Sequence, residues 1–183
     1  MGISGTMKRR AVFLDRDGVI NCALVREGKP YPPASLAELD ILPGVLEALW
    51  QLRKANFLLI VVTNQPDVAR GATPQATVEA IHRYLREQLP LDDIRTCYHD
   101  SNDHCHCRKP KPGLLLNAAR DWNINLKQSF MVGDRWRDIE AGQQAGCQTL
   151  FIDYGYAEKQ PERCHYRITS LLDATCVILK TST

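Results

Sequence analysis

The chain has 183 residues, 44% hydrophobic and 24% charged, a composition that excludes a disordered chain and a membrane protein. Its 23 Lys and Arg residues nearly balance 21 Asp and Glu residues, and the formal net charge of +2 excludes the basic surface typical of nucleic-acid binding. The length fits one domain, which we expect to span residues 8–178.

No apolar run approaches the roughly 18 residues that would predict a membrane-spanning helix. The N-terminal segment MGISGTMKRR carries basic residues, but the apolar run AVFL that follows it stops at Asp15, so we do not interpret it as a signal peptide. We therefore expect a cytoplasmic protein with neither a membrane nor a nucleic acid as partner, and we expect it to be a monomer.

The first elements follow a strand, loop, helix, strand pattern. Residues 11–14 form a short apolar run that ends in acidic residues, as in a buried parallel strand. A loop with several prolines follows, and the next apolar run covers residues 57–62. Residues 44–54 between them are predicted to be a helix with four apolar side chains on one face: Val45, Leu46, Leu49 and Leu52.

The same alternation continues to residue 153. A helix is predicted from Thr73-Pro74 to about Gln88, because proline favours the first turn of a helix. Strands and helices then alternate in an order typical of an α/β doubly wound parallel sheet of the Rossmann type, in which ligands bind beyond the carboxyl ends of the strands. The further predicted elements are strand 94–98, helix 113–122, strand 129–132, helix 135–145 and strand 148–153.

Polar and charged residues follow the apolar runs at three of these strand ends, and two cations precede a helix. A parallel sheet brings such strand ends to one edge, so these residues are expected to form one site. Carboxylates, a hydroxyl and fixed cations are the groups that phosphoryl transfer requires. The residues are Asp15, Asp17, Thr63, Asn64, Arg108, Lys109 and Asp134.

Each of these groups has a predicted task. Mg²⁺ prefers carboxylate, carbonyl and water oxygens, so we expect a magnesium site at Asp15, Asp17 and Asp134. Asp15 is the predicted nucleophile, which would form an acyl phosphate. Asp17 could protonate the leaving oxygen and later accept a proton from water. Lys109 and Thr63 are expected to hold the phosphoryl oxygens.

Asp138 lies one helical turn beyond the predicted metal ligand Asp134. It could add a carboxylate behind the metal site, or it could be an ordinary surface residue of the helix. Taken singly, the other motifs are also compatible with plain turns and helix caps. Their order and their placement after apolar runs favour the functional interpretation.

Four segments resemble the successive motifs of the haloacid-dehalogenase (HAD) superfamily of phosphohydrolases: DRDGVIN, VVTNQ, RKPKPG and MVGDRWRDIEAG. The resemblance covers residues 10–155 and implies a HAD-like fold. It also implies a nucleophile at Asp15, an acid and base at Asp17, and a metal ligand at Asp134. Thr63 and Lys109 match the second and third motifs. Dehalogenases of the superfamily lack the second acid, so the resemblance implies a phosphatase.

The segment TCYHDSNDHCHC combines cysteine and histidine at metal-ligand spacing. Cys97, His99, Cys105 and Cys107 are predicted to bind a structural Zn²⁺ ion, closed to catalysis because four protein ligands leave no position for water. His104 and His106 are the competing ligands in this loop, residues 97–107, and free surface thiols are the alternative. A zinc ion there would fix the loop that leads directly into Arg108.

The zinc loop running into Arg-Lys-Pro resembles the heptose 1,7-bisphosphate phosphatases of HAD subfamily III and the related histidinol-phosphate phosphatases. That resemblance implies a compact member without a large cap domain, and a small sugar phosphate that loses its C7 phosphate. It also implies contacts of the sugar bisphosphate with Arg108 and with residues after the first motif. The expected substrate-binding residues are Asn21, Arg26, Asn64, Gln65, Arg70 and Arg108.

Other functions stay open from the sequence. Histidinol phosphate or another small phosphomonoester could be the substrate, and Pro66-Asp67 departs from the usual loop of the heptose enzymes. A DNA 3′-phosphate fits the motifs but not the near-neutral charge. A phospho-acceptor signalling domain is the non-enzyme alternative, although such a domain has no use for an acid at Asp17.

Overall fold

A computed structural model describes residues 7–182 of the chain. Six parallel strands form one sheet in the order β5-β4-β1-β6-β7-β8, and a short antiparallel hairpin, β2-β3, stands apart from it. The order confirms the predicted doubly wound α/β sheet. The strands are β1 (Arg10–Leu14), β2 (Leu24–Arg26), β3 (Lys29–Tyr31), β4 (Phe57–Asn64), β5 (Asp93–Cys97), β6 (Phe130–Gly133), β7 (Gln148–Ile152) and β8 (Tyr166–Ile168).

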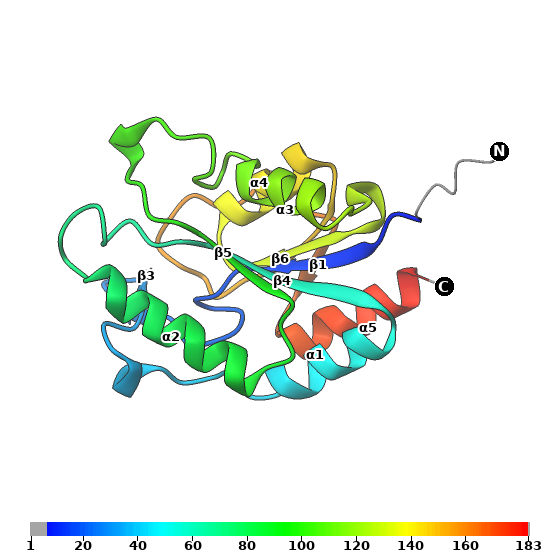
Figure 1. The fold of residues 1–183 in the computed structure, drawn as a ribbon, viewed down its shortest axis with the longest axis horizontal. Helices are drawn as coiled ribbons and strands as arrows, with labels where there is room; N and C mark the ends of the chain where they lie inside the picture. Colours follow the sequence, from blue (N-terminus) through cyan, green and yellow to red (C-terminus); the bar gives the residue numbers. More distant parts are fainter. Residues whose placement is uncertain (1–6, 183) are drawn as a thin grey trace.

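Helices cover both faces of the sheet, α3 and α4 above it and α1, α2 and α5 below it in the view of Figure 1. α1 packs directly against α5. Within residues 7–182, no helix combines the length and apolar character needed to cross a bilayer. The helices are α1 (Val45–Lys54), α2 (Gln75–Gln88), α3 (Gly113–Asp121), α4 (Trp136–Ala145) and α5 (Leu171–Thr181), with 3₁₀ turns η1 (Leu36–Glu38), η2 (Ser101–Asp103) and η3 (Leu126–Gln128).

The core divides into two layers because successive side chains of a strand point to opposite faces of the sheet. In β1, Val12 and Leu14 pack with α1, α2 and α5, whereas Ala11 and Phe13 pack with α3 and α4. All four side chains are fully buried. β1 is therefore anchored on both faces, and its carboxyl end is a rigid position for Asp15.

The segment between β1 and α1 contains only the β2-β3 hairpin and the η1 turn, so within residues 7–182 no separate cap domain covers the sheet edge. This confirms the expected capless architecture. The hairpin was not predicted from the sequence, because its three-residue strands carry no apolar alternation. β8 and α5 were not predicted either.

Most predicted elements are confirmed within one or two residues, but the expected apolar face of α1 is wrong at one position. Leu46 is 48% exposed, whereas Ala48 is fully buried together with Val45, Leu49 and Leu52. Positions 45, 48, 49 and 52 follow the i, i+3, i+4, i+7 spacing of one helical face, and position 46 lies outside that stripe.

Candidate active site

Asp15 lies at the carboxyl end of β1, where its backbone N–H still donates to the carbonyl of Val132 in β6 at 3.0 Å. Only 7% of Asp15 is exposed. The buried Lys109 places its Nζ 2.8 Å from Asp15 Oδ1 and 2.8 Å from the carbonyl of Val62. The structure thus joins the first and third sequence motifs directly.

Lys109 also contacts Asp138, whose Oδ1 lies 2.6 Å from the lysine Nζ. Burial alone would lower the pKa of Lys109, but the charges of Asp138 and Asp15 raise it above its ordinary value. The second oxygen of Asp138 accepts a hydrogen bond from the N–H of Arg135 at 3.0 Å. Asp138 is therefore a buried member of the site and not a surface residue of α4.

Three buried carboxylates, those of Asp15, Asp134 and Asp138, each place an oxygen within 4.8 Å of the others. Burial, followed by the charge of Asp138, raises the pKa of Asp15 to about 7. Burial and the charge of Asp15 raise the pKa of Asp134 well above its usual range. One lysine does not balance three carboxylates, so the cluster favours an additional cation.

Asp134 has one oxygen that fits such a cation. Its Oδ2 accepts a hydrogen bond from the hydroxyl of Tyr156 at 2.8 Å, but its buried Oδ1 has no hydrogen-bond partner among the described residues. A buried carboxylate oxygen without a donor is costly unless a metal ion or water satisfies it. The donor set, oxygens only, is the one that Mg²⁺ prefers.

Gly18 allows the loop after β1 to approach the cluster closely. Its φ is +88°, and a Cβ at this position would lie 2.0 Å from Asp134 Oδ2. The hydroxyl of Tyr154 donates to the carbonyl of Gly18 at 3.0 Å, which ties this loop to the segment after β7. Two tyrosines that the sequence analysis did not single out, Tyr154 and Tyr156, therefore fix the loop and one carboxylate.

The Asp17 carboxylate lies outside the group of three. Its two oxygens accept hydrogen bonds from Arg16, Asn21 and Gln65. Asn21 is fully buried and Gln65 is 2% exposed, and neither lines the cleft in front of Asp15. The structure therefore places these two expected substrate-binding residues around Asp17, and their contact with a substrate stays a prediction.

The cleft beside Asp15 and Asp17 is lined by the β3 hairpin strand, the loop after β4, the segment after the cysteine cluster and the start of α4. Asn64 holds the Lys109 backbone, with its Oδ1 3.1 Å from the lysine N and its Nδ2 3.0 Å from the lysine O. Thr63, 1% exposed, accepts a hydrogen bond from Gln65 at 2.9 Å. The lining residues are Asp15, Asp17, Pro30, Tyr31, Pro32, Asn64, Pro66, Arg108, Lys109, Arg135, Arg137 and Asp138.

Three arginines line this cleft, of which only Arg108 was expected. Arg135 forms an ion pair with Glu158. Arg137 stacks on Trp136, with 4.6 Å between the guanidinium carbon and the ring centre, and has no ion pair among the described residues. Burial and the neighbouring Arg135 lower the pKa of Arg137, as expected for a cation without a carboxylate partner.

Two expected substrate-binding residues lie away from this lining. Arg70 is engaged by Asp100 and Asp67, at 2.7 Å and 3.2 Å. Arg26 is exposed in β2 and stacks over Tyr31 with 5.9 Å between the guanidinium carbon and the ring centre. Neither Arg26 nor Arg70 lines the cleft, so their contact with a substrate stays a prediction.

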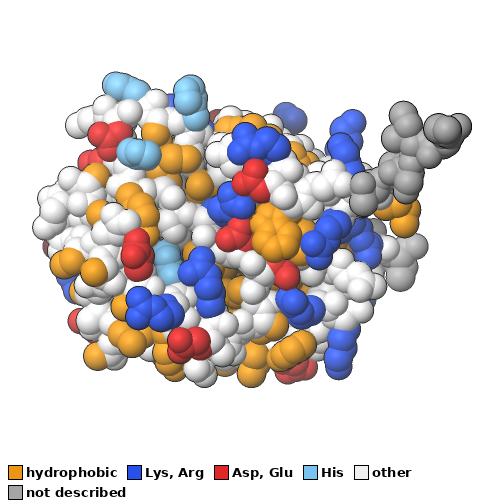
Figure 2. Space-filling model, in the orientation of Figure 1, with side chains coloured by type: hydrophobic (Ala, Val, Ile, Leu, Met, Phe, Trp, Pro, Cys, Tyr) orange, Lys and Arg blue, Asp and Glu red, His pale blue; other side chains and the backbone are white. Residues whose placement is uncertain are grey.

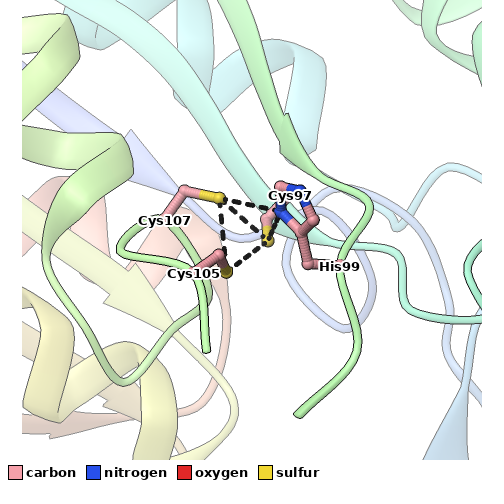
Figure 3. Close-up of side chains that lie close together, drawn as sticks. All are labelled: Cys97, His99, Cys105 and Cys107. Carbon is pink, nitrogen blue, oxygen red and sulfur yellow. Dashed lines mark hydrogen bonds between the residues drawn. The ribbon is translucent and has the colours of Figure 1, made fainter. Parts of the chain in front are cut away.

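Figure 3 shows Cys97, His99, Cys105 and Cys107 pointing toward a common centre. The three sulfurs lie 3.1–3.7 Å from one another, and His99 Nδ1 lies 3.6 Å and 3.3 Å from the sulfurs of Cys97 and Cys107. A tetrahedron of ligands about 2.3 Å from a zinc ion has edges of roughly 3.7 Å. The four side chains therefore fit the predicted zinc site.

The competing ligands His104 and His106 are exposed and lie outside this group of four. Figure 2 shows histidine side chains on the surface at the upper left, where the loop between β5 and α3 lies. Arg108 Nη1 donates to the carbonyl of His99 at 3.1 Å. The cluster and the expected substrate-binding arginine are thus physically connected.

Comparisons with known proteins agree with this fold. A HAD-hydrolase-like family model matches residues 106–174. A D-glycero-β-D-manno-heptose-1,7-bisphosphate 7-phosphatase of Pseudomonas putida is 35% identical over 176 residues, 93% of this chain and 98% of that protein. Its Bordetella bronchiseptica counterpart is 36% identical over 155 residues, 82% of this chain and 84% of that protein.

Solved structures give the same result. The D,D-heptose 1,7-bisphosphate phosphatase of B. bronchiseptica, crystallised with magnesium and phosphate, superposes with a TM-score of 0.79 at 32% identity, over 94% of this chain and 99% of that chain. The enzyme of Burkholderia thailandensis gives a TM-score of 0.64 at 26% identity, over 93% and 99% of the two chains.

A capless parallel sheet with an aspartate at the end of β1, a buried lysine and an aspartate cluster defines a HAD-type phosphatase. The similar proteins described above identify the family within this class. The chain belongs to the HAD-like hydrolases, and within them to the family that contains these heptose bisphosphate phosphatases.

Proposed function

We propose that this protein removes the C7 phosphate of D-glycero-D-manno-heptose 1,7-bisphosphate through a phospho-aspartate on Asp15. The observation that carries the proposal is the buried Asp15–Lys109 pair, which faces an arginine-lined cleft in a chain with heptose phosphatase relatives along most of its length. A bisphosphate carries two anionic groups, and Arg108 and Arg137, which line the same cleft as Asp15, are cations that could bind the second one.

In the first half of the reaction, an oxygen of Asp15 forms a bond to phosphorus while the bond between phosphorus and the sugar oxygen breaks. Asp17 gives its proton to that leaving oxygen. In the second half, water attacks the phosphorus and the bond to Asp15 breaks, while Asp17 takes the proton of the water. Lys109 and Thr63 hold phosphoryl oxygens, and the lysine neutralises part of their charge.

Magnesium is part of the proposal. Asp15 and Asp134 would hold the ion, and Asp17 and Asp138 lie beside these two ligands. The buried Oδ1 of Asp134, which has no hydrogen-bond partner among the described residues, supports this assignment. A bound Mg²⁺ supplies positive charge that lets an anionic carboxylate approach an anionic phosphate. The magnesium in the related B. bronchiseptica structure also supports it.

Zinc at Cys97, His99, Cys105 and Cys107 is proposed as a structural ion. The proposal rests on the converging sulfurs and His99 Nδ1, which leave no open position for water. The hydrogen bond from Arg108 to the His99 carbonyl means that an ordered loop also orients Arg108 toward the cleft. A cytoplasmic location would keep the cysteines reduced and available to the metal. We propose a monomer, since a capless cleft is complete within one chain.

The test is phosphate release from the α- and β-anomers of heptose 1,7-bisphosphate beside histidinol phosphate, each with Mg²⁺. We expect the bisphosphate to have the highest kcat/KM, and Asp15→Asn to abolish turnover. Asp121→Asn, at the exposed end of α3 and outside the lining of the cleft, is the matched control and should keep wild-type activity. Preference for histidinol phosphate would contradict the substrate assignment, and turnover by Asp15→Asn would contradict the phospho-aspartate.

A further inference from the structure

The carboxylate of Asp17, the proposed acid and base, accepts hydrogen bonds from three neighbouring side chains. Arg16 Nε lies 3.2 Å from Asp17 Oδ1, and Arg16 Nη2 lies 3.0 Å and 3.1 Å from Oδ1 and Oδ2. The amides of Asn21 and Gln65 donate to the two oxygens at 3.0 Å and 2.9 Å. The adjacent arginine provides more of these contacts than any other residue.

Arg16 is itself buried, with no exposed surface, and its remaining nitrogen contacts a histidine from another element. Nη1 lies 3.1 Å from Nε2 of His82, a residue of α2 that is 4% exposed. A guanidinium group only donates hydrogen bonds, so Nε2 accepts and the histidine proton lies on Nδ1. His82 thus accepts a hydrogen bond from Nη1, the guanidinium nitrogen of Arg16 that does not contact Asp17.

His82 does not line the cleft. It lies instead in a separate hollow between α2 and β5, beside Glu79, Arg83 and Arg86. A substrate bound at Asp15 therefore does not touch it. Any influence of His82 on the reaction has to pass through Arg16.

We infer that Arg16 and His82 are positioning residues, which together hold the Asp17 carboxylate at the leaving oxygen. This inference rests on the proposed function of Asp17. A carboxylate next to a turn has several rotamers, and proton transfer requires a position within hydrogen-bond reach of the leaving atom. Three contacts from two nitrogens of a guanidinium group that is fixed at its third nitrogen restrict Asp17 to one orientation.

The alternative is that His82 only fills the core of α2. If His82 positions Asp17, the effect of its loss on the reaction depends on the leaving group. If His82 only fills the core, the effect does not. A sugar alkoxide is a poor leaving group that needs a proton, whereas p-nitrophenolate leaves without one. Because kcat/KM reports the transfer of the phosphoryl group to Asp15, the ratio of kcat/KM for the sugar bisphosphate and p-nitrophenyl phosphate measures the acid contribution separately from general damage.

The experiment compares His82→Leu, which removes the acceptor, with His82→Gln, whose amide oxygen can still accept from Arg16. General acid catalysis contributes about 10²–10⁴-fold to a rate. A partly misplaced Asp17 in His82→Leu should therefore lower the ratio of kcat/KM for the sugar bisphosphate to kcat/KM for p-nitrophenyl phosphate about tenfold or more. His82→Gln should stay within about threefold of wild type. Ile81→Ala, which creates a cavity at a buried neighbour on α2, is the control for destabilisation and should leave the ratio unchanged.

A double-mutant cycle completes the test. In an Asp17→Asn background, His82→Leu should cause no further fall in the ratio, because the group on which it acts is gone. An equal loss with both esters, or a further loss in the Asp17→Asn background, would overturn the inference. If His82→Leu does not fold, His82→Asn, which is too short to reach Arg16, takes its place. A wild-type enzyme that hydrolyses neither ester would instead refute the proposed function.

Discussion

His82 also makes a prediction about stability that needs no substrate. Burial, followed by the charge of Arg16, lowers the pKa of His82 from 6.5 to about 3. Arg86 on the same helix acts in the same direction, whereas Asp17 opposes it. Between these two pKa values the unfolded chain binds a proton that the folded chain does not, so the free energy of unfolding must fall as the pH decreases below 6.5.

The size of this loss in the free energy of unfolding follows from the shift in the pKa of His82. Each pH unit below the unfolded pKa costs about 1.4 kcal/mol, so acidification from pH 7.5 to pH 5 should remove about 2 kcal/mol of stability through His82 alone. Other groups also titrate in this range. The quantity to measure is therefore the difference between wild type and His82→Gln, in which the contributions of the other groups cancel.

Urea unfolding at pH 7.5, 6 and 5 provides this difference. The wild type should lose about 2 kcal/mol relative to His82→Gln over the range. His104→Asn, at an exposed loop position with a φ of +49°, is the matched control and should remain parallel to wild type. Parallel curves for wild type and His82→Gln would show that His82 accepts a proton normally, which would refute its assigned hydrogen bond with Arg16.

Four further changes test the rest of the site. Gly18→Ala places a methyl group on Asp134 Oδ2 at a left-handed φ, so Mg²⁺ affinity measured by calorimetry should be lost. Tyr156→Phe removes the donor to Asp134 and should cost about 1–3 kcal/mol in urea unfolding. Cys105→Ser should lower the content of the proposed zinc ion, measured by atomic absorption, and lower the melting temperature. Arg137→Ala should raise KM for the bisphosphate about tenfold but not for a monophosphate, and an equal effect on both would contradict a role at the second phosphate.

The sequence was sufficient for five of the six strands of the sheet and for the polar residues at the carboxyl ends of three of them. Apolar runs that end in Asp15, Thr63 or Asp134 give both the strand and the position of the polar group, because a parallel sheet aligns its carboxyl ends. The cysteine spacing likewise predicted which histidine joins the cluster. In each case the relevant partners lie within a few residues of a strand end or of each other.

The sequence did not reveal contacts that depend on the direction in which a side chain points, and several of these contacts join residues far apart in the chain. Asn21 and Gln65 are the last residues of the motifs DRDGVIN and VVTNQ and were expected to bind substrate, but their amides point to Asp17. His82 pairs with Arg16 across 66 positions, and a histidine on an amphipathic helix carries no signal of such a partner. Tyr156 comes from a loop whose path depends on the packing of β7. The spacing of Asp138 from Asp134 was visible, but its contact with Lys109 was not.

The two aspartates of the first motif are two residues apart, yet the fold gives them opposite surroundings. Burial, followed by the charge of Asp138, raises the pKa of Asp15 to about 7, whereas the charge of Lys109 opposes this rise. Asp17 is tied to an arginine that always carries its charge and is anchored to α2. Separate environments allow similar carboxyl groups to have separate roles. In the proposed mechanism, the carboxylate cluster would therefore set the charge of the nucleophile Asp15, and helix α2, through His82 and Arg16, would position the acid Asp17.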